Sequence, residues 1–187
     1  EACIVAAALK RIYSITKSYF DANRTVGVIV PYRNQIAMIR KEISKLGIPD
    51  LLNISIDTVE RYQGSQRDVI IYSFTIHNFS QLNFLTANTF REEEFIIDRK
   101  LNVAITRARK QLILTGNPDV LTANITFYKL MEYIRQENGF VDIPVNLFCS
   151  GDFEISDLSP AWDIRIDNYA LPDYFKDCYK TFVEEPF

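Results

Sequence analysis

The stretch Val26-Gly27-Val28-Ile29-Val30-Pro31 decides how this chain folds. Its mostly β-branched run is typical of a parallel strand buried on both faces, and Pro31 ends it because proline lacks a backbone N–H. Residues 36–46 then carry apolar side chains at helical spacing, and Gly47 followed by Pro49 is a common signal for a helix end. The sequence therefore predicts a β-α unit from residue 26 to residue 46.

The same alternation continues along residues 1–139. Helices are expected up to about Phe20, from an Asp98 N-cap through about Arg109, and around residues 127–134. Strands are expected at residues 53–58, 69–74 and 112–115, whereas residues 75–93 show no period and predict a long loop. Strands that alternate with helices favour an α/β fold, a doubly wound and mostly parallel sheet with helices on both faces.

Length and composition exclude several classes of protein. A chain of 187 residues with 48% hydrophobic residues can bury a full core, and no apolar run approaches the roughly 20 residues that cross a bilayer. With no signal-peptide pattern either, no membrane partner is predicted and the protein is expected to be cytoplasmic. Cys3, Cys149 and Cys178 are widely separated, so we expect them to pack rather than to form disulfides or bind a metal.

Charge divides the chain into a domain at 1–139 and a C-terminal extension at 140–187. The first carries 18 Lys and Arg against 14 Asp and Glu, and the second carries 3 against 10 together with ten aromatic residues. The basic excess suits a polyanion, although an ordinary solvated surface explains it equally well. We expect the acidic aromatic extension to pack on the domain, with docking of a protein partner as the alternative. Because Glu1 is followed at once by a helix, we also expect the chain to begin inside a larger protein.

Two polar segments stand where chemistry is expected. Ligands of doubly wound sheets gather beyond the carboxyl ends of the strands, and residues 58–68 follow such an end with hydroxyl, amide and guanidinium groups. Gly64 would let backbone amides approach a phosphate, although a polar β-turn explains the segment as well. Residues 98–110 form the second segment, in which Arg107 and Arg109 should point to different sides of a helix, with Lys100 on the Arg107 face. Solvated helix arginines are the plain alternative.

Residues 26–35, 58–68 and 101–109 together resemble motifs IV, V and VI of superfamily 1B helicases, most closely those of nonsense-mediated decay and Okazaki-fragment processing. The resemblance spans about residues 1–122. It implies the second RecA-like lobe, of P-loop NTPase type, of an ATP-hydrolysing helicase or translocase. The partners it implies are single-stranded DNA or RNA and an N-terminal RecA-like lobe of the same parent chain.

The resemblance also implies roles for individual residues. Arg107 matches the arginine finger that reaches the γ-phosphate of ATP held by the other lobe, a contribution worth roughly 10³ to 10⁵ in rate. Because the carboxyl edge of a sheet is the usual ligand side, we expect Arg107 to face that edge. The remaining matches are nucleotide contacts at Gln63, Gly64, Gln66 and Arg109, and nucleic-acid contacts at Thr58, Tyr32 and Gln35. Arg109 is expected to steady the lobe through a carboxylate or backbone contact.

This chain departs from the family at two positions. Gln66 stands where the family has glutamate, so a charged contact near the nucleotide becomes a neutral one. Glu60 stands where Asp or His is more common. The lone His77 is assigned no catalytic role.

The sequence contains neither a Gly-x-x-x-x-Gly-Lys-Ser/Thr loop nor a strand ending in paired acids. The run Glu92-Glu93-Glu94 is read as solvated, and no metal site is predicted. ATP and Mg²⁺ are therefore expected to be held mainly by the other lobe, and this chain is expected to be inactive alone. The alternative function is a non-catalytic binding or scaffold module. A nuclease is disfavoured because no compact Asp, Glu and Lys cluster is present.

Overall fold

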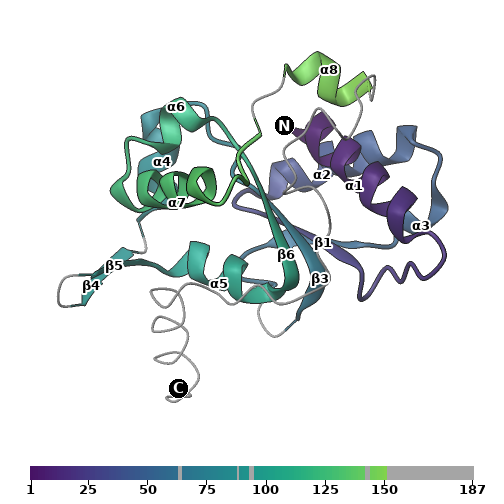
Figure 1. The fold of residues 1–187 in the computed structure, drawn as a ribbon, viewed down its shortest axis with the longest axis horizontal. Coiled ribbons are helices and arrows are strands. Elements are labelled where there is room, and N and C mark those ends of the chain that lie inside the picture. The colour runs from purple at the N-terminus through teal and green to yellow at the C-terminus, as the bar shows by residue number, and fades with distance from the viewer. Residues whose placement is uncertain (63–64, 88, 93–94, 142–143, 151–187) are drawn as a thin grey trace.

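The centre of the structure is a parallel sheet of four strands (Figure 1). The computed structural model describes residues 1–62, 65–87, 89–92, 95–141 and 144–150. The strand order is β2-β1-β3-β6, and every neighbouring pair is parallel. The strands are β1 (Val26–Val30), β2 (Ser55–Thr58), β3 (Arg67–Ser73) and β6 (Ala108–Thr115). All four match predicted strands.

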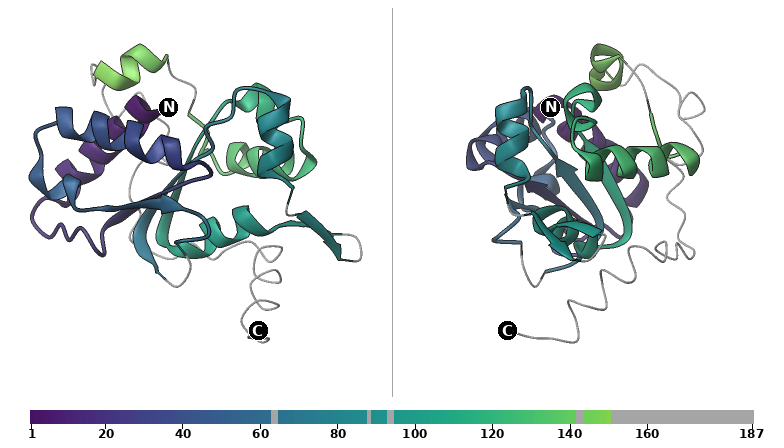
Figure 2. Two further views of the ribbon diagram at one scale, coloured as in Figure 1. Left: turned by 180° about the vertical axis from the view of Figure 1, so that it is seen from behind. Right: turned by 90° about the vertical axis from the view of Figure 1, so that its left-hand side faces the viewer.

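Helices cover both faces of this sheet (Figures 1 and 2). Helices α1 (Ala2–Thr16), α2 (Arg33–Lys45) and α3 (Pro49–Leu52) pack on one face. Helices α4 (Phe79–Leu85), α5 (Arg99–Arg107), α6 (Pro118–Leu121) and α7 (Ile125–Gln136) pack on the other. Successive side chains of β1 alternate between the two cores, with Val28 in the first and Ile29 in the second. The predicted doubly wound α/β fold is confirmed.

Local signals placed several helix ends correctly. Gly47 follows α2 with a φ of +65°, the left-handed conformation that suits glycine after a helix. The Asp98 side chain accepts a hydrogen bond from the backbone N–H of Leu101 at 3.0 Å and so caps α5 as predicted. Helix α1 ends at Thr16 and is therefore shorter than expected.

The prediction of a long loop at residues 75–93 is wrong. Asn78 caps the short helix α4 by accepting a hydrogen bond from the Gln81 N–H at 2.9 Å. Strand β4 (Thr89–Glu92) then pairs with β5 (Phe95–Asp98) in an antiparallel hairpin. Seven helical residues span only two turns, too few for a clear apolar period, so this helix is stabilised by its tertiary contacts. His77 is exposed in the turn before α4.

Part of the C-terminal extension packs on the domain. Helix α8 (Val145–Ser150) lies against α1, and its Phe148 side chain joins the core on that face of the sheet. Burial and the neighbouring Cys3 thiol raise the pKa of Cys149 to about 11. Residues 151–187, which include Trp162 and Cys178, lie outside the described residues. Within the described ranges, no helix is both long and apolar enough to cross a membrane.

Candidate functional site

The motif residues lie at two opposite edges of the sheet. Thr58 ends β2 and Tyr32 follows β1, so both lie at the carboxyl edge. Gln66 precedes β3 and Arg107 precedes β6, and the paired starts of these strands form the amino edge. The expectation that Arg107 faces the carboxyl edge is therefore wrong. The reason is topological, since parallel strands require the chain to return across the sheet before each new strand begins.

The return from β2 to β3 is held against the sheet by Tyr62. Its ring is 2% exposed and lies directly over Gly27 of β1. A Cβ atom at position 27 would overlap the Tyr62 hydroxyl and lie 2.8 Å from Cζ. Burial also raises the pKa of Tyr62. Sequence reasoning missed this packing, although a glycine inside a strand is a known signal of close approach.

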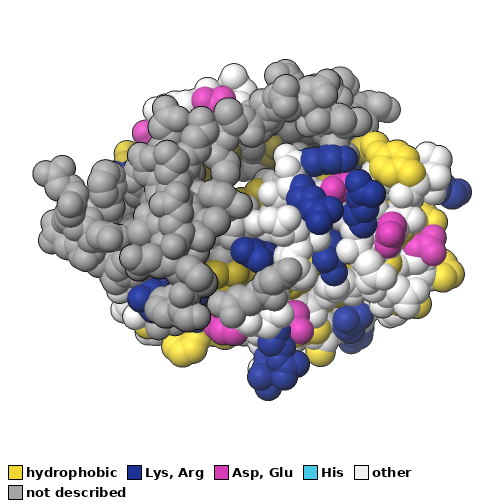
Figure 3. All heavy atoms as spheres, turned by 90° about the horizontal axis from the view of Figure 1, so that it is seen from below, with side chains coloured by type: hydrophobic (Ala, Val, Ile, Leu, Met, Phe, Trp, Pro, Cys, Tyr) yellow, Lys and Arg dark blue, Asp and Glu magenta, His cyan; other side chains and the backbone are white. Residues whose placement is uncertain are grey.

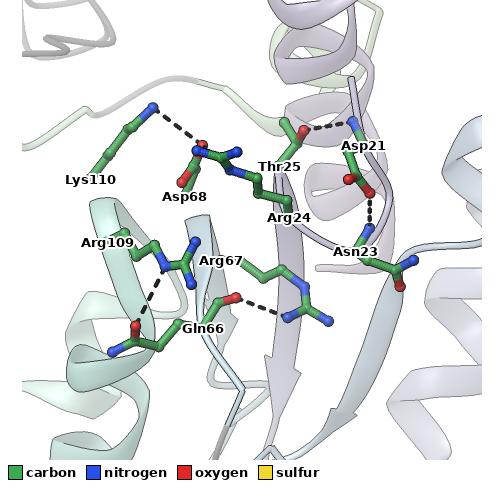
Figure 4. A network of polar contacts seen from close by, with 9 residues as sticks. All are labelled: Asp21, Asn23, Arg24, Thr25, Gln66, Arg67, Asp68, Arg109 and Lys110. Carbon is green, nitrogen blue, oxygen red and sulfur yellow. Dashed lines mark hydrogen bonds and ion pairs between the residues drawn. The ribbon is translucent and has the colours of Figure 1, made fainter. Parts of the chain in front are cut away.

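At the amino edge, one amide side chain joins the two helicase-like segments (Figure 4). The Gln66 Nε2 donates to the carbonyl oxygen of Thr106, and its Oε1 accepts from Arg109 Nε, both at 3.4 Å. Arg109 thus contacts an amide rather than the expected carboxylate or backbone group. It also lies in β6, because α5 ends at Arg107, so the predicted helical divergence of the two arginines does not apply. Gln63 and Gly64 lie outside the described residues.

Arg107 is half-buried at the junction of α5 and β6. Its Nη2 donates to Thr106 Oγ1 at 3.2 Å, and its Nε is buried without a hydrogen-bond partner. Among the described residues, no carboxylate forms an ion pair with it. A partly buried guanidinium with unused donors suits an anion supplied from outside the lobe, so the residue fits a phosphate.

Further basic side chains surround the amino edge. Asp68 lies 3.9 Å from Arg24 and 3.2 Å from Lys110, while Arg67 donates to Ser55 at 2.8 Å. Viewed from the end of the sheet where β6 begins, the described surface shows a group of Lys and Arg side chains with smaller acidic patches among and beside them (Figure 3). This edge therefore attracts negative charge.

The carboxyl edge carries an open hollow of about 420 Å³. The Tyr32 ring stacks on Phe84 with centroids 5.7 Å apart, and its hydroxyl donates to the Gln81 carbonyl at 3.3 Å. Thr58 is 6% exposed and reaches the same hollow. Gln35 does not line it and keeps a buried amide nitrogen without a hydrogen-bond partner. The lining consists of Pro31, Tyr32, Arg33, Asn34, Thr58, Glu60, Arg61 and Phe84.

Helix α5 connects the two edges. Lys100 lies in its first turn with 9% exposure, and its Nζ lies 3.7 Å from Glu60 Oε1 and 5.0 Å from the Phe84 ring centroid. Arg107 ends the helix seven residues later, about 10 Å along its axis. Lys100 therefore does not serve the same site as Arg107, although the two share a helix face. Burial raises the pKa of the capping Asp98 carboxyl, which is 4% exposed.

A family model described as an AAA domain matches residues 1–119. The chain belongs to this AAA domain family. Its relatives include the putative helicase MOV-10 of Gallus gallus, 33% identical over 126 residues, which cover 65% of this chain and 13% of that protein.

Two other relatives match stretches of similar length. The DNA replication ATP-dependent helicase/nuclease DNA2 of Xenopus laevis is 32% identical over 139 residues, covering 72% of this chain and 12% of the relative. The probable RNA helicase armi of Drosophila melanogaster is 29% identical over 141 residues, which cover 73% of this chain and 11% of that protein. The chain therefore spans about an eighth of the length of these relatives. They confirm its place as a C-terminal RecA-like lobe of the superfamily 1 helicases.

Proposed function

We propose that this chain is the C-terminal motor lobe of an ATP-dependent nucleic-acid helicase or translocase. The observation that carries the proposal is the path between β2 and β3. It leaves the carboxyl edge at Thr58, passes Tyr62 on the face of the sheet and reaches the amino edge at Gln66, beside Arg107. One short segment, with Tyr62 buried on the sheet, would thereby join the proposed strand-binding edge to the proposed nucleotide-facing edge.

The amino edge is the proposed nucleotide side. ATP and Mg²⁺ would be held mainly by an N-terminal RecA-like lobe of the parent chain, and Arg107 would face the γ-phosphate across the gap. Ligands gather at the carboxyl edge of such sheets because the loops and helix N-termini that follow the strands bind them. An arginine that acts on a ligand held by another lobe needs only a fixed backbone position, because its side chain is long. The α5–β6 junction supplies that position. Its guanidinium would offset charge on the transferred phosphoryl group, and Gln66 and Arg109 lie at the same edge of the sheet.

The carboxyl edge is the proposed side for single-stranded DNA or RNA. Thr58 and Tyr32 lie on its hollow, and Gln35 lies in the first turn of the neighbouring helix α2. A hydroxyl and an aromatic ring suit backbone and base contacts that do not depend on sequence. ATP-dependent closure of the two lobes would then change how this edge grips the strand.

Replacing Arg107 in the parent protein tests the proposal. We expect Arg107→Ala to leave single-strand binding nearly unchanged and to lower strand-stimulated ATPase by at least about a hundredfold, as expected of an arginine finger. Arg40→Ala is the matched control, since Arg40 is exposed on α2 and donates to the Leu52 carbonyl at 3.3 Å, its one hydrogen bond within the described ranges. A loss below about threefold in Arg107→Ala would remove this residue from the finger role.

A further inference from the structure

Two arginines on the wall of the carboxyl-edge hollow are unpaired among the described residues. Arg33 is the first residue of α2, and Arg61 lies in the turn after β2. Both are exposed, and within the described part of the chain neither guanidinium makes a hydrogen bond or an ion pair. They come from separate elements, a helix start and a turn, 28 positions apart in sequence. The fold therefore brings two unused positive charges to one hollow.

The remaining lining makes this hollow positive and partly apolar. Its acidic residue, Glu60, lies 3.7 Å from Lys100, which offsets its charge. The stacked rings of Tyr32 and Phe84 form an apolar wall, and Phe84 is still 58% exposed. A volume of about 420 Å³ is within the range of roughly 300 to 1,000 Å³ that small ligands occupy.

We propose that Arg33 and Arg61 bind consecutive backbone phosphates of a single strand in this hollow, with Phe84 against the adjacent sugar or base. The inference rests on the proposed function and adds three residues to its strand-binding edge. Guanidinium groups pair with phosphates through several donors at once, and aromatic surface beside a basic groove is typical of sequence-independent single-strand binding.

The test uses the parent protein with Arg33→Gln, Arg61→Gln and the double variant. Binding to a labelled oligothymidylate is measured by fluorescence anisotropy at a series of KCl concentrations. Each lost phosphate contact should reduce the slope of log Kobs against log[KCl] by about 0.7. If affinities converge near 1 M salt, this corresponds to about fivefold weaker binding at 0.1 M per arginine. Arg40→Gln, seven residues along the same helix and off the hollow, should leave slope and affinity unchanged.

The outcomes separate this inference from the proposed function. Slopes that fall in Arg33→Gln and Arg61→Gln but not in Arg40→Gln support the phosphate contacts. Wild-type binding with unchanged slopes in both variants, or with an equal fall in the control, overturns the inference and leaves the proposed function standing. A parent protein that binds no single strand overturns both.

Discussion

Replacing Gly27 by alanine tests how the segment between the two edges is held on the sheet. The new Cβ would overlap the Tyr62 hydroxyl, lie 2.8 Å from Tyr62 Cζ and lie 3.1 Å from Arg67 Cγ. All five residues of β1 are buried, so the strand cannot easily move away. Overpacking a core costs about 1 to 3 kcal/mol. Because a rigid ring is displaced, we expect the upper part of that range, about 2 to 3 kcal/mol.

The free energy of unfolding is measured by urea denaturation of the 187-residue chain. Adding Tyr62→Phe to Gly27→Ala removes the overlapping hydroxyl but keeps the Cζ contact, so it should recover part of the loss. Gly139→Ala is the control, because its Cβ would meet Ile134 Cγ2 at 3.3 Å, a contact that a small shift relieves. A loss below about 0.5 kcal/mol in Gly27→Ala, or no recovery in the double variant, would refute the described packing of Tyr62.

Two further predictions concern α5 and its junction with β6. Burial raises the pKa of Asp98, so the folded protein binds a proton at this carboxyl more tightly than the unfolded protein does. Proton binding therefore stabilises the fold at low pH, and this stabilisation is lost as pH rises from about 4 through the raised pKa. Asp98→Asn should remove that pH dependence while keeping the cap, and Asp98→Ala should cost about 1 kcal/mol; urea titrations at several pH values check both. In the parent protein, Gln66→Glu should lower the KM for ATP a few-fold, because a charged acceptor binds Arg109 more strongly than an amide. Gln66→Ala should raise that KM. Identical KM values in all three proteins would show that Gln66 has no part in the nucleotide site.

Much of the fold could be predicted because its signals are local. The run of apolar residues in β1, the glycine after α2 and the carboxylate before α5 each act on neighbouring backbone, so short patterns identify them. Each of the three helicase-like motifs is also a short stretch of sequence, so the motifs and their order along the chain predicted the helicase family. Helix α4 was missed because two turns carry too few apolar positions to show a period.

The positions of the motifs relative to one another depend on the tertiary structure and not on local patterns. A helix was expected to continue through Arg109, but the chain enters β6 at Ala108, where hydrogen bonding to β3 replaces the helical pattern. Lys100 and Arg107 share a helical face, yet one lies near Glu60 at the carboxyl edge and the other near Gln66 at the amino edge.

From its residue order alone, this chain specifies the four strands of its parallel sheet, the glycine after α2 and the Asp98 cap of α5, since short local patterns mark each of them. Its three motifs likewise specify the family to which it belongs. Which edge of the sheet each motif occupies was decided by the tertiary structure. So were the packing of Tyr62 on Gly27 and the meeting of Arg33 with Arg61. These features join residues tens of positions apart, and their distances depend on the direction in which the chain crosses the sheet.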